Sequence, residues 1–158
     1  MPLGIREEAT MKELYTEIDI DASAEQVWSV LGDFDRYAEW NPFIVEVLGT
    51  AQLGADLRVT LSPPGGRAVT VRPTVTEVAP ARTLEWLGRL GPRGLFDGRH
   101  RFELHDSPNG SRLIQREVFT GVLVPLFTRS LQERTLRGFV AMNVALKRRV
   151  EQTLSRHT

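Results

Sequence analysis

Alternating hydrophobic and polar residues occupy most of the chain between positions 14 and 120. Alternation with a period of two predicts β-strands that are buried on one face. The seven predicted strands are 14–20, 43–48, 55–61, 69–78, 82–90, 95–105 and 112–120. Most of the connections are short and contain glycine or proline, as at 63–66 and 107–110. Because short connections join antiparallel neighbours, we expect an antiparallel meander.

Helical signals interrupt this pattern after the first strand. Ser23 precedes an apolar periodic segment, and Gln26 follows it by three residues, which is a capping-box pattern. We therefore expect a short helix that Gly32 closes. A second short helix is predicted over 33–40, and Pro42 stops it because the residue before a proline is biased away from helical geometry.

The longest helical stretch runs from about Pro125 to Ser155 and has no further proline. One side of this helix is apolar over a little more than a third of its circumference, which suits a helix lying across a sheet. Two of its positions, Thr135 and Gly138, are small, which indicates either a hollow beside the helix or a close backbone contact at Gly138. The stripe consists of Phe127, Leu131, Thr135, Gly138, Phe139, Met142, Ala145, Leu146 and Val150.

Together these elements predict an α+β fold in one domain. The 158 residues suffice for a single sizeable core, which we place at 13–155. Residues 1–12 lack a sustained apolar run, and we expect a flexible N-terminal segment there. No segment has the apolar run of a signal peptide or a membrane span, so we expect a cytoplasmic protein.

Charge composition bears on partners. Lysine plus arginine and aspartate plus glutamate both number 20, so no strong field favours nucleic acid or an anionic membrane. On the long helix, Leu136, Val140 and Val144 lie away from the main stripe. They indicate either a weak dimer patch or packing against a wing of the sheet, and we favour the second. We expect a monomer or a weak homodimer.

Metal and cofactor signatures are missing from the sequence. There is no cysteine, which excludes disulfides, thiolate catalysis and cysteine-based metal sites. The histidines His100, His105 and His157 form no H-x-x-x-H pair. The sequence also lacks phosphate-loop and dinucleotide-binding fingerprints and a G-x-S-x-G elbow. We therefore expect no metal and no cofactor.

The turn at 107–110 fixes a register for the last two predicted strands. If Leu104 lies opposite Leu113, then His100 faces Glu117. One face then carries five charges on seven positions and should be exposed to solvent. That outer face consists of Arg99, Arg101, Glu103, Arg112, Ile114, Arg116 and Val118, and the inner face of His100, Phe102, Leu104, Leu113, Gln115, Glu117 and Phe119.

This register turns His100, Gln115 and Glu117 toward the interior together. Directly opposed side chains have Cβ atoms about 4.5–5.5 Å apart, which allows them to hydrogen-bond. A buried carboxylate is costly unless it is paired, and an imidazole opposite it offsets that cost. Such a pair can bind a ligand hydroxyl or carbonyl, or move a proton. Alternatively it is a structural pair near the rim of the sheet, and a one-residue slip would turn both groups to solvent.

Several segments of the chain resemble the SRPBCC superfamily, the START-like or Bet v 1-like helix-grip proteins. They are most similar to the branch described as polyketide cyclase/dehydrase-like. The matching segments are IDIDASAEQVWSVLGDFDRYAEWNPF at 18–43, GRHRFEL at 98–104, REVFTG at 116–121 and RGFVAMNVALKRRVE in the last helix. The resemblance covers roughly residues 13–152 and implies a seven-stranded antiparallel sheet curled around the long C-terminal helix, with a deep cavity between them.

The resemblance also implies a function. Members bind hydrophobic ligands such as lipids, sterols or polyketide intermediates. We therefore expect a lipid-like, aromatic or polyketide-like ligand in the cavity, with His100, Gln115 and Glu117 as its polar groups. The other expected ligand-binding residues are Trp40 at the mouth and Trp86, Phe102, Phe119, Leu131, Thr135, Phe139 and Met142 along the wall.

Two further function classes stay open. The first is a cofactor-free cyclase or dehydratase in which His100 or Glu117 moves a proton. The second is a protein-interaction or chaperone-regulator module. The iron–sulfur hydroxylase branch of the superfamily is excluded because the chain has no cysteine.

Overall fold

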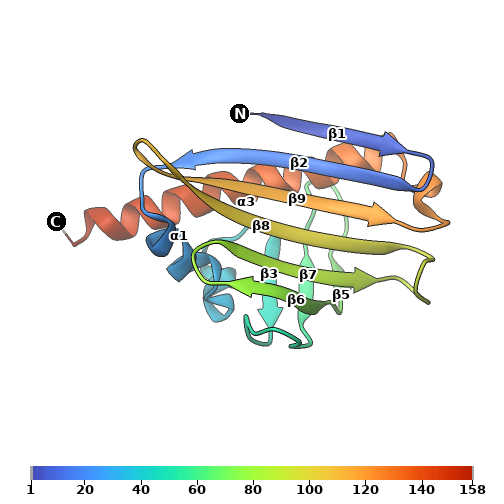
Figure 1. The fold of residues 1–158 in the computed structure, drawn as a ribbon, viewed down its shortest axis with the longest axis horizontal. Helices are drawn as coiled ribbons and strands as arrows, with labels where there is room; N and C mark the ends of the chain where they lie inside the picture. The colour runs from blue at the N-terminus through green and yellow to red at the C-terminus, as the bar shows by residue number, and fades with distance from the viewer. Residues whose placement is uncertain (1, 158) are drawn as a thin grey trace.

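Two antiparallel sheets and a long C-terminal helix form the framework of the protein, as a computed structural model that describes residues 2–157 shows (Figure 1). The larger sheet has the order β1-β2-β9-β8-β7-β6, and the smaller has the order β3-β4-β5. The helix α3 (Arg129–Ser155) runs behind β2 and β9 in this view. The strands are β1 (Leu3–Glu8), β2 (Met11–Ile20), β3 (Ile44–Leu48), β4 (Arg58–Leu61), β5 (Val69–Val71), β6 (Thr74–Ala79), β7 (Thr83–Arg89), β8 (Asp97–Ser107) and β9 (Gly110–Thr120).

One predicted strand, 69–78, is two strands in the structure. Pro73 separates β5 from β6 because proline has no N–H to donate to a ladder and is confined to strand edges and corners. At this corner Leu57 donates its N–H to the carbonyl of Pro73 (2.8 Å), and Val75 donates to the carbonyl of Ala55 (2.9 Å). These bonds join the edges of the two sheets, so the chain curls into a half-barrel around one side of α3.

The N-terminal segment also differs from its expectation. A flexible segment was predicted over 1–12, but residues 3–8 form β1, which pairs with β2 from Leu3 opposite Thr16 to Glu8 opposite Met11. Residue 1 lies outside the described residues. Only backbone pairing is needed to order an edge strand, and polar side chains such as Arg6 and Glu7 suit an exposed edge. The lack of a sustained apolar run therefore did not prevent strand formation.

The short helices follow the predicted caps. In α1 (Ala24–Leu31), Ser23 and Gln26 form the predicted capping box, and Gly32 is the C-cap. The second predicted helix is a 3₁₀ turn, η1 (Phe34–Arg36), followed by the single α-helical turn α2 (Tyr37–Trp40). Another 3₁₀ turn, η2 (Val124–Leu126), contains Pro125, so α3 begins later than predicted, after the N-cap Thr128.

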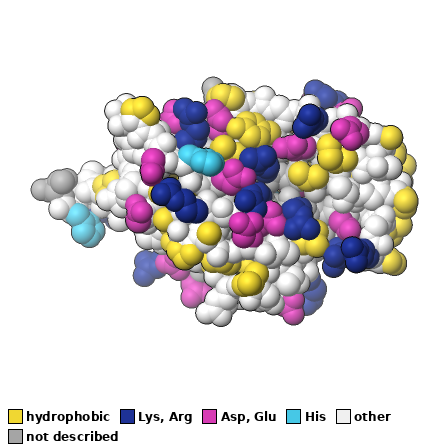
Figure 2. Space-filling view, viewed as in Figure 1, with side chains coloured by type: hydrophobic (Ala, Val, Ile, Leu, Met, Phe, Trp, Pro, Cys, Tyr) yellow, Lys and Arg dark blue, Asp and Glu magenta, His cyan; other side chains and the backbone are white. Residues whose placement is uncertain are grey.

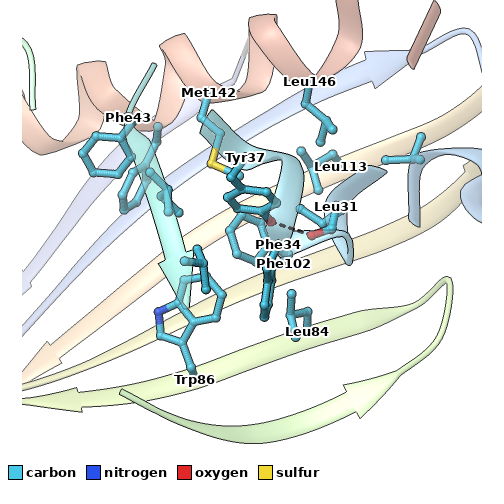
Figure 3. Close-up of a cluster of buried hydrophobic side chains, with 14 of the residues drawn as sticks. Leu31, Phe34, Tyr37, Phe43, Leu84, Trp86, Phe102, Leu113, Met142 and Leu146 are labelled. Atoms are coloured by element: carbon cyan, nitrogen blue, oxygen red, sulfur yellow. Dashed lines mark hydrogen bonds between the residues drawn. The ribbon is translucent and has the colours of Figure 1, made fainter. Parts of the chain in front are cut away.

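The hydrophobic core lies between the sheets and α3 and is closed at one end by α1 and α2. Figure 3 shows its aromatic centre, where Tyr37 lies between Phe34 and Met142 and its hydroxyl donates to the carbonyl of Leu31. Phe102, Phe139 and Met142 are fully buried.

The register of β8 and β9 confirms the sequence prediction, with Leu104 opposite Leu113, Phe102 opposite Gln115 and His100 opposite Glu117. The opposite face of these strands carries the predicted charges. Figure 2 shows that face, where basic and acidic side chains are interspersed over the middle of the sheet. Arg101 is central to this network, within 2.9 Å of Glu85 and 2.8 Å of Glu103.

Candidate functional site

A pair of facing glycines opens a gap in the inner surface of the large sheet. Gly88 on β7 lies opposite Gly98 on β8 in the antiparallel register. The neighbouring inward positions hold large side chains, Trp86 and His100 on one side and Phe119 on the other. Because glycine has no side chain, nothing from the sheet occupies the space above these two positions. A recess therefore opens between this part of the sheet and α3.

This recess is a cavity of about 190 Å³. Strands β7, β8 and β9 form one wall, strands β4 and β5 form another, and the start of α3 contributes Thr135 to the lining. Its surface is mainly apolar and aromatic. It is lined by Phe43, Val59, Leu61, Val71, Pro73, Trp86, Gly88, Arg89, Leu90, Phe96, Gly98, His100, Glu117, Phe119, Phe127 and Thr135.

His100 and Glu117 are the acid–base pair of the cavity wall. Nδ1 of His100 lies 3.3 Å from Oε2 of Glu117. The imidazole is 3% exposed and stacks on Trp86 with ring centroids 5.3 Å apart. Phe102 and Phe139 approach the imidazole from other sides, at 4.7 and 5.0 Å. The aromatic rings hold the imidazole in one orientation, so the pair is a rigid feature of the wall.

A chain of buried amides supports the imidazole from behind. Gln115 is fully buried, and its Oε1 lies 3.0 Å from Nε2 of His100. Its Nε2 donates to Oδ1 of Asn143 on α3 (2.7 Å) and to the carbonyl of Phe139 (3.3 Å). Asn143 in turn donates to Oγ1 of Thr16 on β2 (2.8 Å). The polar chain therefore ties α3 to three strands through the interior.

The sequence matches the model of the family described as polyketide cyclase / dehydrase and lipid transport over residues 11–152. The chain belongs to that family, within the SRPBCC superfamily. None of the curated protein sequences matches it.

Solved structures share this SRPBCC fold. The Zhui aromatase/cyclase from Streptomyces sp. R1128 superposes with a TM-score of 0.72 at 19% identity, covering 91% of this chain and 96% of that one. A START superfamily protein from Mycobacterium smegmatis has a TM-score of 0.68 at 23% identity, covering 91% and 99%. The di-domain ARO/CYC StfQ from the steffimycin biosynthetic pathway has a TM-score of 0.63 at 15% identity, with 90% of this chain covered. This chain spans 49% of StfQ. Identities this low show the fold alone.

Five of the predicted ligand-binding residues of this SRPBCC chain line the cavity. They are Trp86, His100, Glu117, Phe119 and Thr135. Gln115 does not reach the cavity surface but holds His100 from behind. The helical stripe predicted one of these correctly, Thr135, because it projects from the first turns of α3 toward the recess.

The other predictions place residues outside the cavity. Phe102, Phe139 and Met142 are fully buried and do not line the cavity. Phe102 and Phe139 pack against the ring of His100 instead. Trp40 packs edge-on against Tyr37 with ring centroids 5.1 Å apart and does not line the cavity. Leu131 is 42% exposed and lies one helical turn before Thr135, outside the cavity lining.

Leu131 belongs instead to an apolar rim next to the cavity. This shallow depression shares three aromatic or aliphatic residues with the cavity wall, Leu90, Phe96 and Phe127. The rest of the rim is contributed by the β7–β8 connection, the 121–128 connection and the start of α3. It is completed by Gly91, Leu95, Leu123, Leu126 and Leu131.

Sequence reasoning missed the two glycines that create the recess. A glycine inside an alternating strand pattern was the available signal, because such a position often marks a close backbone approach or a missing side chain. It also missed the opposite wall, which includes Val59, Leu61 and Val71. These residues come from the small sheet, whose position over the large sheet depends on the corner at Pro73.

Across residues 2–157, no group of three or more His, Cys, Asp or Glu side chains is arranged to hold a metal ion. None of the helices in the same range is both long and apolar enough to cross a membrane. The ionisable side chains that line the cavity are Arg89, His100 and Glu117. Arg89 is half-exposed at the mouth and faces Asp97 at 3.7 Å.

Proposed function

We propose that this protein binds a hydrophobic small molecule in the cavity between the large sheet and α3. The observation that carries the proposal is the recess over Gly88 and Gly98, which is walled by aromatic side chains and has one rigid polar pair. Concave, mainly apolar sites with a few placed polar groups are typical of small-molecule sites. Membership of a family described by cyclase, dehydrase and lipid transport activity supports the same conclusion.

The size of the cavity limits the ligand. An apolar protein cavity of about 150 Å³ holds a benzene molecule, and sites for drug-sized ligands are about 300–1,000 Å³. The cavity here, about 190 Å³, therefore takes one aromatic ring or a compact bicyclic group. A longer ligand would extend over the apolar rim formed by Leu90, Phe96 and Phe127.

The test uses naphthalene as a probe and two matched threonine variants. Thr135 lines the cavity, whereas Thr153 is exposed further along α3. Both hydroxyls bond to the carbonyl four residues earlier, at 2.9 and 2.8 Å. Thr135→Phe places a ring in the cavity, so naphthalene binding measured by tryptophan fluorescence should fall at least tenfold. Thr153→Phe should bind as the wild type does. Equal binding by both variants, or none by the wild-type protein, would reject the site.

A second candidate function is proton-transfer catalysis of the cyclase or dehydratase type. The observation that favours it is the His100–Glu117 pair on the cavity wall, where one group accepts a proton and its neighbour stabilises the charge. The probe is 2-tetralone, a bicyclic ketone with acidic α-protons. The wild-type protein should accelerate exchange of these protons in D₂O, followed by NMR, and Glu117→Gln should not. If the wild type binds the ketone without accelerating exchange, the pair serves binding only.

A further inference from the structure

The direction of each hydrogen bond in the buried amide chain is set by two backbone carbonyls. A carbonyl can only accept, so Thr16 donates its single hydroxyl proton to the carbonyl of Gln115 (3.1 Å). Oγ1 of Thr16 must then accept from Nδ2 of Asn143 (2.8 Å), which turns Oδ1 of Asn143 toward Nε2 of Gln115. The second carbonyl, of Phe139, also requires the amide nitrogen of Gln115 on its side (3.3 Å).

This series of buried hydrogen bonds fixes the tautomer of His100. With its nitrogen committed to Asn143 and Phe139, Gln115 presents only Oε1 to the imidazole, at 3.0 Å from Nε2. An amide oxygen carries no proton, so Nε2 of His100 must donate. Nδ1 is then left to face Glu117, 3.3 Å away.

One proton must therefore lie between His100 and Glu117, because two bare acceptors at that separation repel each other. Either the imidazole is protonated at Nδ1 and faces a carboxylate, or Oε2 of Glu117 carries the proton and donates to Nδ1. The two forms share one property. In both, the other oxygen of Glu117, Oε1, has no proton and can only accept.

Oε1 of Glu117 is also the oxygen that is available to a ligand. Within residues 2–157 no side chain or backbone group donates a hydrogen bond to it. It lies above Gly98, where an added Cβ would be 2.8 Å away. The rings that face the pair are uncharged, and they include Trp86 from β7, Phe102 from β8 and Phe139 from α3. The remaining charged group of the cavity, Arg89, lies at the mouth and faces Asp97.

We propose that Gln115, Asn143 and Thr16 are positioning residues that hold the cavity ready for a ligand bearing a hydroxyl group. The hydroxyl donates to Oε1 of Glu117, so a phenol, enol or alcohol is selected over the corresponding ether or hydrocarbon. The inference rests on the proposed function, because it places the ligand in the same cavity. A hydrogen bond to a charged or strongly polarised acceptor corresponds to a preference of about 10–100-fold.

The affinities of 2-naphthol and 2-methoxynaphthalene test this selection, since the two probes share a ring system and differ in the donor. The wild-type protein should bind 2-naphthol about 10–100-fold more tightly in calorimetry. Glu117→Leu should lose the preference. Glu117→Gln should keep a smaller preference of the same sign, because Nδ1 of His100 accepts from the new amide nitrogen and turns the amide oxygen to the cavity.

The positioning role has its own readout in the ¹⁵N NMR spectrum of His100. The wild-type protein should show a proton on Nε2 at every pH at which it is folded. Gln115→Met removes the acceptor, so a tautomer with the proton on Nδ1 should appear. A purely structural role of Gln115 would change stability without changing the tautomer, and that result would overturn the positioning role.

The outcomes separate the two proposals. If both naphthyl probes bind the wild type equally, hydroxyl selection is wrong but the binding cavity stands. If neither binds to folded protein, the cavity proposal fails and this inference with it. If Glu117→Gln prefers the ether, the direction of the amide chain is wrong. A far-UV spectrum of each variant confirms that the comparison is made on folded protein, and Glu117→Gln provides the comparison if Glu117→Leu does not fold.

Discussion

Gly138 of α3 packs directly against the ring of Phe43, the residue that leads into β3. A Cβ added at Gly138 would overlap two ring atoms of Phe43 and would lie 3.0 Å from a third. Of the two sequence interpretations, a hollow or a close contact at this position, the structure shows the close contact. The same ring lines the cavity, so this contact sets one wall of the site.

Gly138→Ala should therefore destabilise the protein. Overpacking a core costs about 1–3 kcal/mol, which exceeds or matches the gain of about 1 kcal/mol that alanine brings to a helix interior. Urea unfolding measures the change. In the Phe43→Leu background the smaller side chain leaves room, so the same substitution should cost less. Additive effects in this double-mutant cycle would show that the two residues do not clash.

Gly98→Ala should weaken hydroxyl selection with little effect on the fold. The new Cβ would lie 2.8 Å from Oε1 of Glu117, and the end of a glutamate side chain can move at low cost. The expected result is a lower affinity for 2-naphthol with a thermal midpoint close to that of the wild type. Gly88→Ala is the matched control, because its Cβ would have contacts of 3.8 Å or longer. A loss of naphthol affinity in both variants would point to cavity volume instead.

Tyr37→Phe should lower stability by about 1–3 kcal/mol, the usual cost of leaving a buried polar group without its partner. The Tyr37 side chain is fully buried, and its hydroxyl donates to the carbonyl of Leu31 at the end of α1 (Figure 3). Burial also raises the pKa of this phenol well above its ordinary value. Tyr15→Phe is the control, since that hydroxyl bonds to Glu17 at the partly exposed sheet surface. Equal urea midpoints for the two variants would contradict the prediction.

Glu85 should make the protein sensitive to acid. Burial favours the neutral form of this carboxyl, but hydrogen bonds from Arg99, Arg101 and Thr76 outweigh it and hold the pKa of Glu85 below its ordinary value of 4.5. A lowered pKa in the folded state contributes stability that is present above pH 4.5 and is lost as the pH falls through the folded-state value.

Glu85→Gln tests this dependence. The variant should be less stable than the wild type at pH 7, and the difference should shrink as the pH is lowered below 4.5. Urea midpoints measured between pH 7 and pH 3 follow the change. Glu46→Gln, at an exposed position on β3, should parallel the wild type throughout. A constant difference in stability for Glu85→Gln over the whole pH range would mean that ionisation of this carboxyl does not contribute to the pH dependence of folding.

The sequence by itself determined the local elements and the facing of β8 and β9. Alternation and a two-residue turn suffice to set an antiparallel register, so His100 and Glu117 could be paired without coordinates. The capping box of α1 is equally local, since Ser23 and Gln26 are three residues apart.

Tertiary structure alone decided where the interior is filled and where it is open. Phe139 and Met142 share a helical face with Thr135, yet both are fully buried outside the cavity, whereas Thr135 lines the recess over Gly88 and Gly98. The hydrogen-bonded series from Thr16 to His100 likewise joins residues that are up to 127 positions apart in the sequence. Periodicity reports which side of an element is buried, but the volume between two elements depends on every side chain that enters it, and those side chains meet only after the chain has folded.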